Sequence, residues 1–454
     1  MSETRKQFLG EFPSTHDSDL IACVGTNGSP NTRDYAIGFL NAGEVLLQQQ
    51  YVKYPYTSRH LADHMVYPIC FNIRHGIEIS LKHFLCELKK LYIHRQSPFD
   101  AFSKNSHDIE EIWQDYCRLA SQFDNRLAVM VQTLKPYIKP WGEIDASGQT
   151  FRYAFSNDAQ KHLTEYSIID LSKVTLNLDC LKTHLADNFD LLSLLDEEYG
   201  CNTHTKNLSR MELCLLAREL PIRSDWNEGL ASIKQRWILD RKLSSNEFNR
   251  ACDLIQSHWE FSSEIGVEVP LLGGISAADL VWVIEQTMYF QRVIHGQPDQ
   301  DSDFASIETA LAFHKRKEDW LNSHTVEEIR ERLFPELVAN ITSLYYNKHE
   351  SSYCEDYRLH YEIELKKLSL KTQNGLMEAF MHVIQKQTFI SGLIDGLALL
   401  KQDSIIRTIK DIEGVFTHFD EMAVEGKQSK TDNYHDWYVS LPRITETEKY
   451  YYQR

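Results

Sequence analysis

The chain has 454 residues, of which 42% are hydrophobic and 25% charged, with only 19 glycines and 12 prolines. This composition supports the buried cores of two or three domains and excludes a collagen-like or largely disordered chain. The formal net charge of −17 opposes general binding to phosphate backbones, although a local basic surface remains compatible with it.

The nine cysteines are scattered and form no CxxC pair, which is typical of reduced core residues and not of a zinc ribbon or a disulfide framework. No apolar run approaches the ~18 residues of a membrane span, and the first residues lack the apolar core of a signal peptide. We therefore expect a cytoplasmic protein without a membrane partner. P-loop, dinucleotide-binding and nucleophile-elbow motifs are absent, which disfavours those enzyme classes, and no motif indicates a metal or cofactor.

Apolar residues three or four positions apart predict several amphipathic helices after a polar N-terminal segment over residues 1–33. In the first half of the chain these expected helices cover residues 34–50, 58–68, 73–90, 108–131 and 158–197. Asp170 is the expected N-cap of the run that begins at Leu171. Two prolines and two glycines predict a long irregular connection over residues 135–150, and the alternating residues 151–155 predict a short extended piece.

The polar, turn-rich segment at residues 199–207 predicts the boundary between two helical domains. Further amphipathic stretches follow at residues 208–219, 226–240, 244–263, 276–294, 304–321, 325–346, 354–390 and 402–424. Ser244 with Glu247, and Thr325 with Glu328, have the spacing of capping boxes. We therefore predict an all-α fold that comprises a helical bundle over residues 34–200, a second helical domain over 208–424 and an aromatic polar tail over 425–454.

The most informative predicted helix is 73–90, in which Arg74, Glu78 and Lys82 form a charged stripe beside the apolar face. Charges at i,i+4 form a salt-bridge ladder in which each exposed pair contributes about 0.3–0.5 kcal/mol. Alternatively, the stripe is a ligand-binding site in which Arg74 and Lys82 hold a phosphate and Glu78 orients them. The spacing alone supports both interpretations.

This helix also begins a pattern of three sequence pieces. Gly76 to Lys82 reads small-x-E-x-x-L-K, His107–Asp108–Ile109 starts a later helix, and Phe151–Arg152–Tyr153 follows, with Ala154 where a proline is common. In this order the pieces resemble the HEPN (higher eukaryote and prokaryote nucleotide-binding) family of helical domains. The resemblance covers roughly residues 34–195, and the C-terminal half resembles no family that we identify.

The resemblance implies a bundle of four or more helices that often forms a homodimer. Many such domains are metal-independent ribonucleases of toxin–antitoxin, CRISPR or phage-defence systems, and others bind nucleotides or partner proteins without catalysis. It therefore implies a bacterial defence or stress-response protein that acts through RNA, a nucleotide or a protein partner encoded in the same operon. No metal or other cofactor is implied.

Ribonucleases of this family use an R-x(4–6)-H motif, in which a guanidinium holds the scissile phosphate and an imidazole lies near the 2′-hydroxyl. Arg59 and His64 have this spacing, with Arg59 as the phosphate ligand and His64 as acid or base. Their position before the Glu78 helix departs from the family, where the motif lies on a late helix. A polar helix face with chance spacing is the preferred explanation of the pair. A metal site at His60 and His64 is disfavoured, because no glutamate follows the first histidine.

Two weaker catalytic candidates are His107 and Arg152, which would meet in a polar cleft. The structural alternative is that Asp108 or Ser106 caps a helix and His107 packs beside it. A third hypothesis for the whole chain is a non-catalytic scaffold whose acidic surface binds a basic partner or mimics a nucleic acid.

Overall fold

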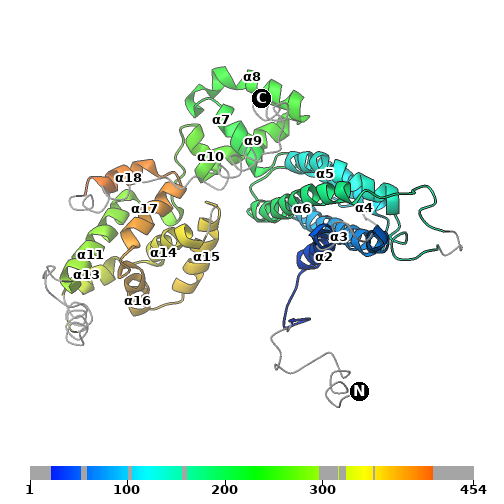
Figure 1. The fold of residues 1–454 in the computed structure, drawn as a ribbon. Coiled ribbons are helices and arrows are strands. Elements are labelled where there is room, and N and C mark those ends of the chain that lie inside the picture. The colour runs from blue at the N-terminus through cyan, green and yellow to red at the C-terminus, as the bar shows by residue number, and fades with distance from the viewer. Residues whose placement is uncertain are drawn as a thin grey trace, which may run out of the picture. The chain divides into compact units, whose positions relative to one another are not determined.

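The computed structural model describes residues 22–52, 59–100, 105–155, 161–295, 315, 324–350 and 353–412. Within these residues the protein is all-α, as predicted, and the only extended pairing is an isolated bridge between Phe155 and Lys161 (Figure 1). The chain divides into two compact units, Met1–Gly200 and Cys201–Arg454. Most of the predicted helix 304–321 and the whole tail 425–454 lie outside the described residues.

The N-terminal unit is built around one long central helix. Its helices are α2 (Thr32–Val52), α3 (Arg59–His94), α4 (Ile109–Phe123), α5 (Asn125–Asp145) and α6 (Leu171–Gly200). Among the helices of this unit that the structure describes, α3 packs against each of the others (Figure 1). The apolar stripe predicted on α3 is fully buried, as its helical spacing requires: Ile73, Ile77, Leu81, Phe84 and Leu88. Asp170 caps α6 as expected, because its carboxylate accepts the amide N–H of Ser172 at 2.9 Å.

Prolines interrupt neither α3 nor α5, which corrects two predictions. Pro68 lies inside α3, so the two helices expected on either side of it are one, and Pro136 and Pro140 lie inside α5, where we expected an irregular connection. A proline removes one helical hydrogen bond and leaves one carbonyl without its partner. In α5 both prolines are exposed, so water can bind these carbonyls while Leu134 and Ile138 remain buried on the opposite face.

The helix expected over residues 108–131 is broken at Asp124. The residue is extended (φ −148°, ψ 137°) and separates α4 from α5. Its backbone N–H bonds to the carbonyl of Ala120, and its carboxylate accepts the amide N–H of Arg126 at 2.9 Å. Asp124 therefore ends one helix and caps the next. The residues after α5, including Phe151 and Arg152, form turns and not the predicted extended piece.

The C-terminal unit is also helical. Its elements are α7 (Arg210–Glu219), η1 (Arg223–Asp225), α8 (Trp226–Arg241), α9 (Ser245–Ser257), α10 (Trp259–Glu264), η2 (Leu272–Gly274), α11 (Ala277–His295), α13 (His324–Arg332), α14 (Pro335–Glu350), α15 (Asp356–Leu368), α16 (Gln373–Ile384), α17 (Phe389–Leu399) and α18 (Asp403–Lys410). One hydrophobic core lies among α7 to α10, and a second among α11 and α13 to α18.

Several helix boundaries in this unit differ from those predicted. His258 separates α9 from α10, and the stretch 354–390 contains α15, α16 and the start of α17. Ser244 caps α9 as expected, whereas the capping box of Ser209 and Glu212 on α7 was missed. Among the described residues, no helix is both long enough and apolar enough to cross a membrane.

Candidate functional site

The charged stripe of α3 is centred on the carboxylate of Glu78, which is buried. Its Oε2 accepts a hydrogen bond from Arg74 Nη1 at 2.5 Å, and its Oε1 accepts one from Lys82 Nζ at 2.8 Å. His107 Nδ1 lies 2.7 Å from the same Oε1. Burial alone would raise the pKa of Glu78, but the hydrogen bonds from Lys82 and His107 and the charge of Arg74 lower it below its ordinary value. Glu78 is therefore ionised and holds three nitrogen groups, which we call the Glu78 cluster: Arg74, Glu78, Lys82 and His107.

Arg74 is the structural member of this cluster. Only 2% of the residue is exposed, and its guanidinium donates to the backbone carbonyls of Asp145 and Ala146 at 3.1 and 2.7 Å and to that of His107. Two of these carbonyls belong to the C-terminal end of α5, where a cation is favourable. Arg74 thus joins α3 to the end of α5 and the start of α4, and its hydrogen-bonding groups face the protein.

The loop after α5 approaches Arg74 closely through Gly148. This glycine has φ +75°, and a Cβ atom there would lie 2.6 Å from Arg74 Nη1. Both the left-handed conformation and the short approach require glycine. Thr150 N–H bonds to Asp145 Oδ1 at 3.1 Å and holds the next part of the loop.

Lys82 and His107 are the surface members of the cluster. The side chain of Lys82 is 25% exposed and that of His107 is 71% exposed. Because Nδ1 of His107 faces the ionised Glu78, the proton is favoured on Nδ1, which leaves the lone pair of Nε2 on the exposed edge of the ring. A buried carboxylate therefore orients one ammonium and one imidazole at the surface of the unit.

The same face of α3 continues toward its N-terminus as a group of rings. The ring of His75 stacks on that of Phe71, with centroids 5.7 Å apart and an interplanar angle of 8°. The guanidinium of Arg152 lies over Phe71 at 5.6 Å and over Tyr153 at 5.5 Å. Burial is the largest cause of the lowered pKa of His75. The charge of Glu78 opposes it, and the charges of Arg74, Arg152 and Lys82 lower the pKa further.

The sequence candidates are thus partly brought together. Arg74, Glu78, Lys82 and His107 share one cluster, although they come from two segments about 30 residues apart. Arg152 lies instead over the rings of Phe71 and Tyr153 and does not pair with His107 in any described contact.

The alternative ribonuclease pair lies on the first turns of α3. Arg59 is the first residue of this helix, and its side chain falls outside the described part. His64 is exposed one turn later. The described structure therefore gives no evidence for a site at Arg59 and His64 beyond their spacing in the sequence.

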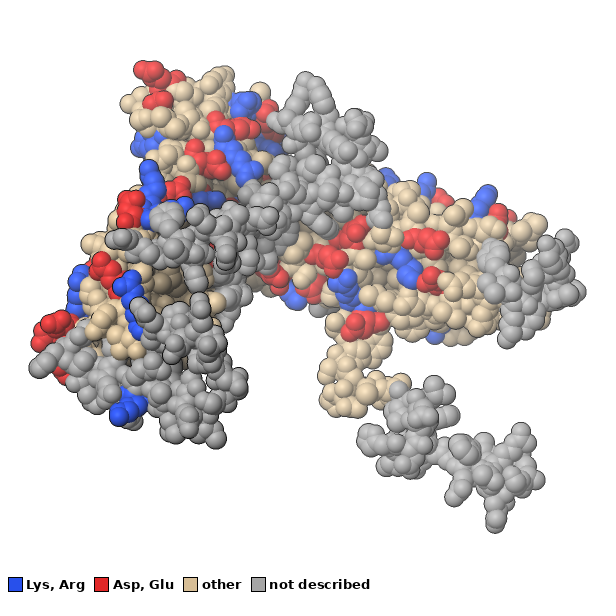
Figure 2. All heavy atoms as spheres, turned by 60° about the vertical axis from the view of Figure 1, so that its left-hand side comes forward, with Lys and Arg blue, Asp and Glu red and all other residues tan. Residues whose placement is uncertain are grey.

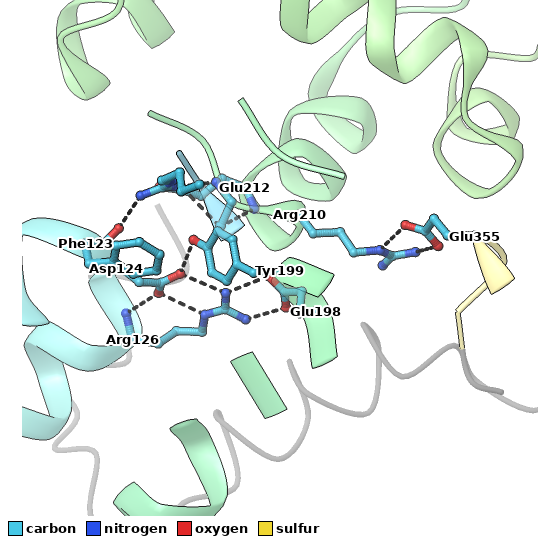
Figure 3. Close-up of polar contacts among 10 residues, drawn as sticks. Phe123, Asp124, Arg126, Glu198, Tyr199, Arg210, Glu212 and Glu355 are labelled. Atoms are coloured by element: carbon cyan, nitrogen blue, oxygen red, sulfur yellow. Dashed lines mark hydrogen bonds and ion pairs between the residues drawn. The ribbon is translucent and has the colours of Figure 1, made fainter. Parts of the chain in front are cut away.

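A second polar cluster of the N-terminal unit is entirely buried. The guanidinium of Arg126 lies between Asp124 and Glu198, with Nη2 donating at 2.9 and 2.8 Å, and Tyr199 Oη donates to Asp124 at 3.0 Å (Figure 3). Burial would raise the pKa of Asp124, but Arg126 lowers it to about 2. These groups are buried and paired with one another. Their ion pairs therefore link α5 to α6, and the groups are not accessible to a ligand.

The C-terminal unit contains a set of groups with the composition of a metal site. His258 Nε2, Cys354 Sγ and a carboxylate oxygen of Glu355 lie within 4.8 Å of one another. However, His258 Nδ1 accepts the amide N–H of Phe261 at 3.3 Å, which places the proton on Nε2, toward Glu355 at 3.0 Å. Nε2 therefore has no lone pair for a metal.

The neighbours of these groups also disfavour a metal. The fully buried Arg210 donates through Nε to Glu355 Oε1 at 2.7 Å (Figure 3). Its Nη2 donates to Glu260 at 2.5 Å. Burial is the main reason that the pKa of Cys354 is raised well above its ordinary value, so this thiol stays protonated. The guanidinium already supplies the positive charge, and the arrangement is a structural ion-pair network.

Charged side chains on the visible face of the described residues are mixed in sign. Figure 2 shows Lys and Arg interspersed with Asp and Glu, without a continuous basic surface. Any site for an anion on this visible face is therefore local.

Comparison of the chain with protein-family models, with curated proteins and with solved structures gives no match.

Proposed function

We propose that the N-terminal unit is a HEPN-like domain that binds a phosphate group of RNA or of a nucleotide at the Glu78 cluster. The observation that carries the proposal is a partly exposed ammonium, Lys82 Nζ, and an exposed imidazole, that of His107, which are both held by one buried carboxylate. In this role the protein acts in a bacterial defence or stress-response system, in the cytoplasm. A homodimer and a protein partner from the same operon belong to the proposal through the family resemblance alone.

The arrangement suits a phosphate because the two groups are oriented before the ligand arrives. A partly exposed ammonium and an imidazole with a fixed ring orientation can both donate to phosphate oxygens when the imidazole is protonated. Arg74 adds a buried positive charge behind Glu78, so the carboxylate does not repel the ligand strongly. Pre-organised donors lose little conformational entropy on binding.

Fluorescence anisotropy with a short labelled RNA at low salt tests this proposal. We expect the double variant Lys82→Ala with His107→Ala to bind at least tenfold more weakly than the native protein, because two charge-assisted contacts are lost. A matched control removes the same two residue types at positions on α3, Lys90→Ala with His94→Ala, since these residues pair with Glu87 and Asp196 away from the cluster. Equal losses in the two double variants would contradict the proposal.

A metal-independent ribonuclease is the second candidate function. It is favoured by the contact between His107 Nδ1 and the ionised Glu78, because a carboxylate that orients a histidine leaves Nε2 to act as a general base. Cleavage of labelled RNA in the presence of EDTA tests this role. Loss of cleavage in His107→Ala assigns the base to His107. Loss in Arg59→Ala or His64→Ala would instead assign catalysis to the alternative pair.

The scaffold hypothesis makes the opposite expectation. It gains support if neither RNA nor nucleotides bind the native protein at low salt, where electrostatic attraction is strongest. Both units carry more Asp and Glu than Lys and Arg, so a basic partner would then be the ligand to seek.

A further inference from the structure

Two exposed side chains beside the Glu78 cluster have no role in the phosphate proposal. Arg152 is exposed, and Tyr153 is 53% exposed. The guanidinium of Arg152 lies between two rings, 5.6 Å from the centroid of Phe71 and 5.5 Å from that of Tyr153. We call these three residues, Phe71, Arg152 and Tyr153, the Tyr153 platform. Phe71 is half-buried in this group, and Arg152 and Tyr153 are its solvent-exposed members.

Two sets of contacts hold the platform in place: ring contacts with α2 and α3, and backbone hydrogen bonds within its own loop. His75 stacks on Phe71, and Phe39 of α2 meets the edge of His75 with centroids 4.4 Å apart. The amide N–H groups of Arg152 and Tyr153 both bond to the carbonyl of Gln149, at 3.2 and 3.0 Å. The loop is therefore fixed before any ligand binds.

Helical spacing places the platform and the cluster on one face. Phe71, His75, Glu78 and Lys82 are separated by four, three and four residues, the spacing of neighbours on one side of a helix. Phe71 and Glu78 are seven residues apart, which is about 10 Å along the helix axis. In addition, His75 is subject to the charges of both Arg152 and Lys82. A single extended ligand can therefore reach both places.

We propose that the Tyr153 platform is a nucleobase-stacking subsite, and that the ligand of this unit is single-stranded RNA several nucleotides long. The inference rests on the proposed phosphate function. Unpaired bases stack on tyrosine rings and on arginine planes, whereas the bases of a duplex are covered by their neighbours. The separation of about 10 Å is about three times the 3.4 Å rise of a stacked strand, so a mononucleotide spans it poorly.

Anisotropy titrations of the full-length protein test the subsite with three probes. These are a single-stranded RNA, the same RNA paired with its complement, and an abasic strand of equal length. We expect the single strand to bind more tightly than the other two. Tyr153→Ala should weaken single-strand binding about five- to hundredfold, the loss typical of one stacked base. Binding of the abasic strand should stay unchanged, and Tyr153→Phe should retain most of the affinity.

The control variant is Tyr166→Ala, which removes another exposed tyrosine of the same unit and should leave binding unaltered. If Tyr153→Ala changes no affinity while Lys82→Ala with His107→Ala weakens every probe, the stacking subsite is overturned and the phosphate site stands. Equal binding of duplex and single strand also overturns it. If no probe binds the native protein, the phosphate function itself fails.

Discussion

At the scale of single residues, Glu78 joins a structural pair to a surface pair. Its bond to Arg74 is buried, whereas its bond to Lys82 is partly exposed. The sequence predicted that the three residues share a helix face. It did not predict that Arg74 would be buried, because the carbonyls that bind it come from residues 107, 145 and 146. Such long-range partners leave no periodic signal.

Substitutions at Glu78 and at Lys82 should therefore have very different effects on stability. We expect Glu78→Gln to lower the free energy of unfolding by about 3 kcal/mol, since it removes the nearer of the two buried carboxylates beside Arg74 and leaves only that of Asp145, 4.0 Å away. Lys82→Ala should cost no more than about 1 kcal/mol, as is usual for an exposed pair. Urea unfolding followed by circular dichroism measures both. Equal costs would show that Arg74 and Glu78 are not coupled as described.

A second residue-scale prediction concerns the pH dependence of stability. The pKa of Asp124 is lowered from 3.8 to about 2 in the folded protein, since Arg126 outweighs burial. A carboxyl group whose pKa is lower in the folded protein contributes its full stabilisation above its unfolded pKa. This contribution is lost as the pH falls through the folded pKa. The stabilisation is on the order of 2 kcal/mol. We therefore expect the free energy of unfolding to fall between about pH 4 and pH 2.

The variant Asp124→Asn provides the control for this titration. It keeps the side-chain size and the capping oxygen but removes the titrating group. Thermal unfolding across this pH range should show that the free energy of unfolding depends less steeply on pH in the variant than in the native protein. Identical slopes would assign the acid sensitivity to other carboxylates.

At the scale of elements, the loop after α5 is the part that positions the candidate site. Gly148 lets this loop pass Arg74 with a left-handed backbone. Gly148→Ala should destabilise the N-terminal unit by about 1–3 kcal/mol, because it combines backbone strain with a clash. Gly25→Ala is the matched control, since Gly25 is also left-handed (φ +57°) but has no atom within 4 Å of the added Cβ. If thermal unfolding shows an equal loss of stability in the two variants, the loop at Gly148 does not approach Arg74 closely.

Helix existence was easier to predict than helix ends. The apolar spacing on α3 and the cap at Asp170 are local signals, and both predictions are confirmed. Pro136 and Pro140 misled the prediction because the cost of a proline in a helix depends on its exposure, which composition does not reveal. The helix break at Asp124 was not predicted either, because it depends on contacts of Asp124 with Arg126 and of Arg126 with α6.

At the scale of the whole molecule, the all-α class follows from periodicity and is confirmed, while the sites depend on tertiary contacts. The chain divides after Gly200, inside the turn-rich segment that composition had singled out. Both units are acidic by residue count, so the net charge opposes RNA at long range. The proposed phosphate binding must therefore come from the two nearby cations of the Glu78 cluster, Lys82 and the protonated His107.

The salt dependence of RNA binding tests this central claim most directly. For single strands, the slope of log K against log salt concentration is about −0.7 for each phosphate neutralised, so two cations predict a slope of about −1.4. Lys82→Ala should reduce its magnitude by about 0.7. A slope that Lys82→Ala leaves unchanged would contradict a phosphate site at the Glu78 cluster.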